Sequence, residues 1–168
     1  TLVSSSAASD VYKRQQYEIK HIHENIGVTV VYVTHDQGEA LTMSNRIAVF
    51  NDGKVQQLSS PDKLYEEPVN SFVAEFIGEN NTFGGEVVDL SNGSCKVKLS
   101  HGEIIANPIS VKSKGDRTTV SIRPERALIN PENKMDNNHS GTIEEVIYHG
   151  DHTRVRLNLL GNSEVILK

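Results

Sequence analysis

The sequence predicts an α/β unit over residues 16–80, followed by an all-β unit over residues 81–168. Helix-like and strand-like apolar patterns alternate in the first part, whereas short strand-like runs separated by turn residues fill the second. The charge changes at the same place, because residues 1–80 carry a net charge of −5 and the remainder is neutral overall. A chain of 168 residues is long enough for two such small units.

Residues 1–15 are rich in Ser and Ala and follow neither the helix period nor the strand period. We interpret this segment as an artefactual or disordered leader, of the kind that translated adaptor sequence leaves at the end of a gene fragment. A flexible natural terminus is the alternative. The segment is therefore left out of the fold prediction.

The first predicted helix begins at Gln16 and ends at Gly27, with isoleucines recurring on one face at helical spacing. His21 and His23 lie two positions apart on it and so point in different directions, which makes them a poor pair of metal ligands. Val28–Thr34 is almost entirely β-branched or aromatic. This composition is typical of a strand covered on both faces, as in a parallel sheet flanked by helices.

Thr34-His35-Asp36 closes that strand, and a helix follows over about residues 37–43. Asp36 is the expected N-cap, and Glu39 three residues later completes a capping-box pattern. The other elements expected in this unit are a strand at 46–50, an Asn-Asp-Gly hairpin turn at 51–53, a returning strand at 54–58, and short helices at 60–67 and 71–77.

The second unit contains only short strand patterns, expected at residues 83–90, 95–99, 103–106, 118–123, 142–148, 153–159 and in a last run to Lys168. Six or seven short strands at this spacing predict a small barrel of the OB type. Residues 130–141 are polar and read as a surface loop. Cys95 is the single cysteine, which excludes an internal disulfide, and its place on a strand predicts a small core side chain.

Composition excludes several functions. The net charge of −5 argues against a whole-chain design for binding nucleic acid. A strand-binding OB face needs basic residues beside stacking aromatics, and the second unit is neutral with only Phe83 and Tyr148 as aromatics. No apolar run approaches the roughly 18 residues that span a bilayer. We therefore expect no nucleic-acid partner.

A combination of short motifs runs from Val30 to Asn81: Thr34-His35-Asp36-Gln37, Glu39-Ala40-Leu41, Arg46-Ile47-Ala48-Val49, Asp52-Gly53, Pro61, Leu64-Tyr65, Pro68, Phe72-Val73-Ala74 and Phe76-Ile77-Gly78. This run resembles the end of the ATP-binding subunit of ABC importers, and more narrowly the subfamily for spermidine/putrescine, maltose and iron. Ser121-Ile122-Arg123-Pro124-Glu125 is similar to a strand end of the TOBE regulatory domain of such subunits. The resemblance implies an α/β remnant of a P-loop ABC ATPase domain at 16–80, then an OB-like TOBE domain at 81–168 that we expect to be truncated at its C-terminus.

The resemblance assigns one catalytic and cofactor-binding residue, His35, which matches the switch histidine that contacts the γ-phosphate of ATP. An ordinary loop histidine is the alternative. Asp36 is explained by its N-cap position. We expect no metal site, because the turn cluster His149, Asp151 and His152 offers no third shielded ligand.

The phosphate-binding pattern Gly-x-x-x-x-Gly-Lys-Ser/Thr does not occur in these 168 residues. In the resembling family, the signature loop and the strand carrying the catalytic Glu lie upstream of the motifs found here. We therefore expect a C-terminal fragment that does not hydrolyse ATP alone, while ATP and Mg²⁺ belong to the parent protein.

The implied parent function is ATP-driven solute import, with spermidine/putrescine as the solute. The implied partners are a second copy of the ATP-binding subunit, transmembrane permease subunits and, indirectly, an external solute-binding protein. The implied location is the cytoplasmic face of the bacterial inner membrane, as a peripheral subunit. The alternative is a free-standing OB-like module that binds a small effector or a regulatory partner.

Overall fold

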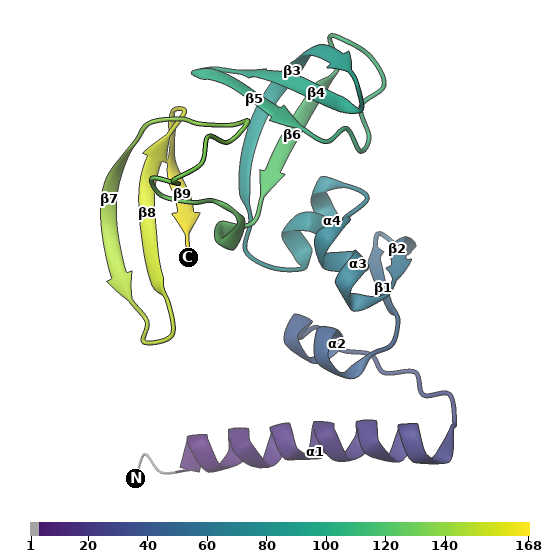
Figure 1. Cartoon of the computed structure of the whole chain (residues 1–168). Helices are drawn as coiled ribbons and strands as arrows, with labels where there is room; N and C mark the ends of the chain where they lie inside the picture. Colours follow the sequence, from purple (N-terminus) through teal and green to yellow (C-terminus); the bar gives the residue numbers. More distant parts are fainter. Residues whose placement is uncertain (1–3) are drawn as a thin grey trace. The chain divides into compact units, whose positions relative to one another are not determined.

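The computed structural model describes residues 4–168, with side chains described from Arg14 onward. The chain forms two compact units that divide between Glu67 and Pro68 (Figure 1). This border lies earlier than the change in sequence pattern near residue 80, because the helix Ser71–Phe76 packs against a strand of the β-rich unit. Among the described residues, no helix is both long and apolar enough to cross a membrane.

The first unit opens with α1, Ser4–Ile26, which begins well before the expected start at Gln16. The segment that was left out of the fold prediction as a leader is helical from Ser4 onward, while residues 1–3 lie outside the described residues. A helix satisfies its own backbone hydrogen bonds, so it can extend through a Ser/Ala-rich segment without a periodic apolar face. The predicted end is confirmed: Gly27 has φ +71°, and its N–H donates to the carbonyl of His23 at 3.0 Å.

Residues 28–34 form neither a helix nor the predicted strand. A strand exists only through hydrogen bonds to a neighbour, and no strand in residues 4–168 pairs with this segment. Its apolar side chains are consequently uncovered within the described chain, with Val31 86% and Val33 91% exposed. The prediction of a strand at 28–34 was therefore wrong for the described residues.

The rest of the first unit consists of α2 Gln37–Met43, the antiparallel hairpin of β1 Ile47–Asn51 and β2 Lys54–Ser59, and α3 Pro61–Glu66. The predicted hairpin turn is confirmed, because Asp52 and Gly53 both have positive φ, +50° and +70°. Ser60 precedes α3, but its side chain makes no capping bond. Its hydroxyl instead bonds the carboxylate of Asp62 and is the main cause of the lowered pKa of that group.

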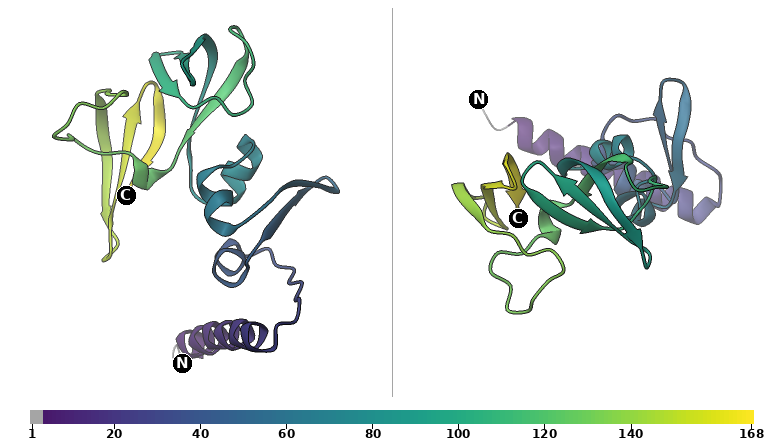
Figure 2. Two further views of the ribbon diagram at one scale, coloured as in Figure 1. Left: turned by 45° about the vertical axis from the view of Figure 1, so that its right-hand side comes forward. Right: turned by 90° about the horizontal axis from the view of Figure 1, so that it is seen from above.

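The second unit begins with α4, Ser71–Phe76, followed by β3 Asn81–Ser91, β4 Ser94–Leu99, β5 Gly102–Ala106, β6 Arg117–Ile122, the 3₁₀ turn η1 Pro124–Arg126, β7 Gly141–Tyr148, β8 Thr153–Leu159 and β9 Asn162–Leu167. All strands predicted here are confirmed. They form two antiparallel sheets, ordered β5-β4-β3-β6 and β7-β8-β9 (Figure 2). This mostly-β architecture fits the predicted OB-like domain, although its strands pair as two separate sheets.

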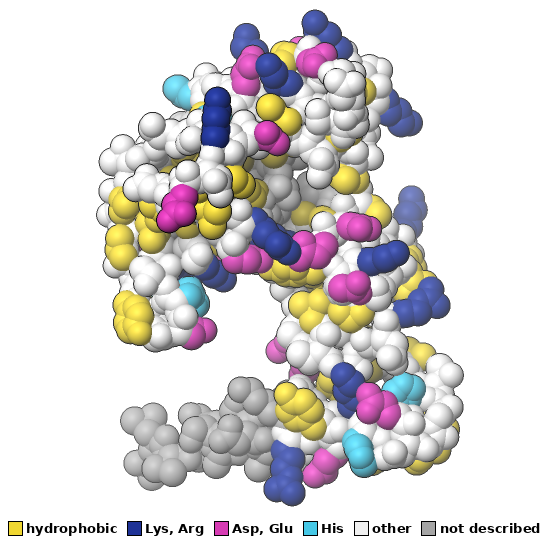
Figure 3. Space-filling model, viewed as in Figure 1, with side chains coloured by type: hydrophobic (Ala, Val, Ile, Leu, Met, Phe, Trp, Pro, Cys, Tyr) yellow, Lys and Arg dark blue, Asp and Glu magenta, His cyan; other side chains and the backbone are white. Residues whose placement is uncertain are grey.

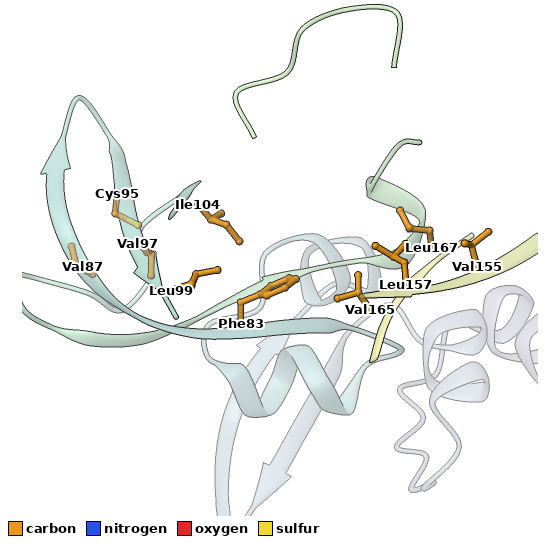
Figure 4. Close-up of a cluster of buried hydrophobic side chains, with 10 residues drawn as sticks. All are labelled: Phe83, Val87, Cys95, Val97, Leu99, Ile104, Val155, Leu157, Val165 and Leu167. Atoms are coloured by element: carbon orange, nitrogen blue, oxygen red, sulfur yellow. The ribbon is translucent and has the colours of Figure 1, made fainter. Parts of the chain in front are cut away.

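One hydrophobic core lies between these two sheets. Figure 4 shows its side chains, which come from both: Phe83, Val87, Cys95, Val97, Leu99, Ile104, Val155, Leu157, Val165 and Leu167. Cys95 is 3% exposed, so its predicted role as a core side chain is confirmed. The alternation of buried and exposed residues along β4 follows from its pleat, with one face on the core and the other in solvent.

Asn81 joins the two sheets through its side chain. Its Nδ2 donates to the carbonyl of Ile166 at 2.7 Å, and its Oδ1 accepts from the N–H of Ile166 at 2.8 Å. The side-chain amide of a β3 residue thus pairs with the backbone of β9 as a strand would. Asn81 is 4% exposed, so both bonds are made in a dry environment.

We expect Gly85→Ala to destabilise the second unit by about 1–3 kcal/mol, since overpacking of a tight site costs that much. A Cβ on Gly85 would lie 2.6 Å from the carbonyl oxygen of Lys98 and 2.6 Å from Val97 Cγ1. The neighbouring Gly84→Ala is the matched control, because a Cβ there meets no atom within 4 Å. Urea unfolding measures both. Equal midpoints for the two variants would contradict the close approach of β3 and β4.

Candidate functional site

His35 lies in a bend between the segment 28–34 and the start of α2. The residue is exposed, and within residues 14–168 no side chain or backbone group is hydrogen-bonded to its ring. The imidazole can therefore offer either ring nitrogen to a ligand. The neighbouring residues, rather than the ring, hold the position of this bend.

Asp36 caps α2 as predicted, because its Oδ1 accepts from the N–H of Glu39 at 3.1 Å. The second half of the expected capping box differs. The N–H of Asp36 donates to Thr34 Oγ1 at 2.9 Å, and the Glu39 carboxylate accepts from the Thr34 hydroxyl at 2.6 Å. The Thr34 hydroxyl thus links Asp36 and Glu39, the two residues of the predicted capping box. Glycine at position 38 leaves room for the Asp36 side chain, because a Cβ on Gly38 would lie 3.1 Å from Asp36 Oδ1.

α1 contacts the α2 region through a polar stripe. Gln16 Nε2 donates to Glu39 Oε1 at 3.1 Å, and Lys20 Nζ donates to the carbonyl of Thr42 at 3.1 Å. His23 Nε2 lies 3.2 Å from Asn45 Oδ1. These residues recur at the spacing of one helix face, while the isoleucines that predicted the helix are exposed. The spacing of the isoleucines predicted the helix, whereas polar residues make its contacts with the α2 region.

Arg123 has a structural role in the second unit. Its Nη1 donates to the carbonyls of Ala74 at 2.9 Å and of Gly78 and Glu79 at 3.3 Å. The side chain is 8% exposed and binds the carbonyl groups at and beyond the end of α4, which have no helical partner. Within the Arg123-Pro124-Glu125 motif, Arg123 thus joins the residues after β6 to the end of α4.

The side chains of the turn cluster between β7 and β8 contact one another. His152 Nδ1 lies 2.8 Å from Asp151 Oδ1, and the rings of His149 and His152 stack with centroids 5.1 Å apart. The hydrogen bond from His152 is the main cause of the lowered pKa of Asp151. Among the described side chains, no group of three potential ligands converges on a point.

The second unit has a hollow of about 540 Å³ that sequence reasoning did not predict. Its charged lining residues come from the segment just before β3 and from β7, β8 and β9: Glu79, Glu145, Arg154, Arg156 and Glu164. They pair with one another: Arg154 bonds Glu79, and Arg156 lies 3.3 Å from Glu145 and 3.8 Å from Glu164. In Figure 3, basic and acidic side chains lie next to one another on this unit. Charge within the hollow is therefore largely compensated.

One buried polar atom at this hollow has no partner. Asn80 Oδ1 accepts no hydrogen bond in the described structure, although Asn80 Nδ2 donates to Ser121 Oγ at 2.8 Å.

Of the two aromatic residues that a stacking face would need, Phe83 is buried in the core and Tyr148 is 76% exposed. No regular sequence period brings the charged residues together, because they come from strands far apart in the chain.

Comparison with known proteins gives two findings. Residues 120–168 match the TOBE domain. The chain is also 38% identical over 165 residues to the spermidine/putrescine import ATP-binding protein PotA of Trichodesmium erythraeum, covering 93% of this chain and 43% of that protein. Its counterpart in Fusobacterium nucleatum is 38% identical over 171 residues, covering 96% and 46%, and that in Mesorhizobium japonicum 38% over 148 residues, covering 88% and 40%.

The chain thus spans less than half the length of these relatives. The similarity to the Fusobacterium nucleatum protein covers 96% of this chain, so the matched region includes the position of His35. The resemblance indicated by the motifs is confirmed: over nearly its whole length this chain is similar to ATP-binding proteins of spermidine/putrescine import, and residues 120–168 match the TOBE domain.

Proposed function

We propose that this chain is the C-terminal part of the ATP-binding subunit of an ABC importer, with residues 16–80 as a remnant of the P-loop ATPase domain and residues 81–168 as its TOBE domain. The observation that carries the proposal is the similarity to spermidine/putrescine import proteins, which continues from the segment around His35 into the TOBE match. The complete subunit would couple ATP hydrolysis to the import of spermidine or putrescine.

In this proposal His35 is the residue that acts on the nucleotide. An imidazole N–H can donate a hydrogen bond to the γ-phosphate and stabilise the charge that develops there during phosphoryl transfer. The exposed ring at the bend before α2 has no competing protein partner within residues 14–168, which fits such a role. ATP and Mg²⁺ supply the reacting phosphoryl group and its counter-charge. Their other ligands in the complete subunit would be the phosphate-binding loop and the acidic residues of the catalytic strand.

The partners follow from the same proposal. Two copies of the complete subunit would pair around ATP and drive transmembrane permease subunits, with an external solute-binding protein delivering the polyamine. The site of action would be the cytoplasmic face of the bacterial inner membrane. Copurification of the complete subunit with its permease from detergent-solubilised membranes tests this arrangement, and polyamine-stimulated ATP hydrolysis by that complex tests the solute.

We expect this 168-residue chain to bind ATP no more tightly than the millimolar range, because backbone N–H groups of a phosphate-binding loop supply most of the affinity for the phosphates. Isothermal titration calorimetry of the purified chain with Mg·ATP measures this. A dissociation constant below a micromolar would contradict the proposal that this chain holds only part of the nucleotide site. ADP serves as the control, since it lacks the phosphate that His35 would contact.

The hollow in the second unit favours a second, subsidiary function, the binding of a small effector. Asn80 Oδ1 is a buried acceptor without a donor there, and the surrounding ion pairs could reorganise around a charged guest. Titrating the chain with polyamines and with a single-stranded oligonucleotide distinguishes an effector module from a nucleic-acid module. Binding of neither would leave the TOBE unit without an effector role.

A further inference from the structure

Glu39 is buried although it carries an ionisable side chain. It is 7% exposed, and among the described residues only Asn81 and Arg123 are polar or charged and similarly buried. A carboxylate withdrawn from water requires hydrogen-bond donors, since an unpaired buried charge costs several kcal/mol. Its donors therefore show what the residue holds in place.

Two of these donors come from the segment that leads into His35. The Thr34 hydroxyl donates to Glu39 Oε2 at 2.6 Å, and the Tyr32 hydroxyl donates to the same oxygen at 3.2 Å. A distance of 2.6 Å is typical of a hydroxyl bonded to an ionised carboxylate. Gln16 Nε2 donates to the other oxygen at 3.1 Å. Glu39 thus connects the segment 28–34 to α2, and separately connects α1 to α2.

The bonds around Thr34 close a ring that encloses His35. Thr34 Oγ1 donates to the Glu39 carboxylate and accepts from the N–H of Asp36 at 2.9 Å. Asp36 Oδ1 in turn accepts from the N–H of Glu39 at 3.1 Å. Both chain neighbours of His35 are therefore tied to Glu39. A threonine hydroxyl has one donor hydrogen and two acceptor lone pairs, so it can serve both bonds at once.

We propose that Thr34 and Glu39 are positioning residues that fix the bend at His35 and so aim its ring at the nucleotide, a proposal that rests on the function proposed above. The ring itself is exposed and hydrogen-bonded to nothing within residues 14–168. Its direction therefore depends on the backbone at Thr34 and Asp36. A displacement of about 1 Å at a reacting group can cost on the order of 10²-fold in rate, so this ring of bonds matters for turnover.

The first test uses the 168-residue chain and measures hydrogen exchange of the Asp36 amide by NMR. Thr34→Val keeps the shape of the side chain and removes the hydroxyl, so the Asp36 amide loses its acceptor. We expect its exchange to accelerate about fivefold or more, the factor that corresponds to one net hydrogen bond of about 1 kcal/mol. Thr34→Ser keeps the hydroxyl and should retain slow exchange. Unchanged exchange in Thr34→Val would overturn the ring.

Gln16→Leu is the matched control for a merely structural role of Glu39. It removes the donor from α1 and leaves the donors from the His35 segment in place. We expect this variant to leave exchange of the Asp36 amide unchanged. Acceleration in Gln16→Leu equal to that in Thr34→Val would mean that Glu39 supports the whole unit rather than this bend, and would overturn the positioning role.

The second test uses the complete subunit, recovered with the coding sequence that precedes this chain. We expect Thr34→Val to lower kcat for ATP hydrolysis about 10-fold to 100-fold with little change in KM, and Thr34→Ser to restore it. Because the positioning residues act through His35, the double variant Thr34→Val/His35→Ala should be no slower than His35→Ala alone. Multiplicative losses, or a normal kcat in Thr34→Val, would overturn the proposal. Normal turnover in His35→Ala would instead defeat the proposed function, so the two failures are distinct.

Discussion

His35→Ala should reduce ATP turnover of the complete subunit by about 10²-fold or more, which is the usual loss when one preorganised transition-state donor is removed. The substitution deletes an exposed ring that no hydrogen bond holds within residues 14–168, so the fold has no reason to change. The loss should therefore appear in kcat at saturating ATP. A coupled phosphate-release assay at several ATP concentrations separates kcat from KM.

His21→Ala provides the matched control. His21 is an exposed histidine of the same unit, and its ring contacts the side chain of Asn25 within α1. We expect this variant to hydrolyse ATP at the normal rate. If His35→Ala also retained near-normal hydrolysis, His35 would be an ordinary loop histidine, and the catalytic assignment would fall while the similarity to import proteins would stand.

Asn81→Leu should be the most destabilising single substitution that we predict for the second unit. It leaves both the N–H and the carbonyl of Ile166 buried without partners, and each such group costs about 1–3 kcal/mol. The expected loss is therefore about 2–6 kcal/mol. Urea unfolding of the chain, followed by circular dichroism in the β-sheet region, measures it.

Asn80→Leu tests whether this effect belongs to the position rather than to the loss of any asparagine. That neighbour makes one hydrogen bond, to Ser121, and its Oδ1 has no partner. Its removal should cost about 1 kcal/mol or less. If the two variants unfolded at the same urea concentration, the side-chain bridge between β3 and β9 would contribute nothing to stability.

Local structure in this chain could be predicted from the residues wherever the cause was local. Asp52-Gly53 adopts the positive φ values that a tight hairpin requires, Asp36 caps α2, and β4 alternates between buried and exposed residues. The segment 28–34 shows the limit of such reasoning. Its β-branched residues predicted an extended backbone, but a strand also needs a neighbour, and pairing is not encoded in the segment itself.

The candidate site divides in the same way. His35 could be found from its motif, and Asp36 from its cap. The role of Glu39 could not, because the capping-box pattern assigned it to the backbone of α2, whereas its carboxylate accepts from Thr34, Tyr32 and Gln16. Gln16 lies 23 positions away in the sequence. Contacts of that kind depend on how α1 folds back, which no local pattern specifies.

The hydrogen bonds from Arg123 to the end of α4 limit where the chain can be shortened without losing them. The guanidinium is buried and donates to the carbonyls of Ala74, Gly78 and Glu79. A piece excised at residue 81, where the strand pattern begins, would lose all three of these acceptors together with α4. An excision before Pro68 retains them. A piece that keeps the hydrogen bonds of Arg123 therefore includes α4 as well as the two β-sheets.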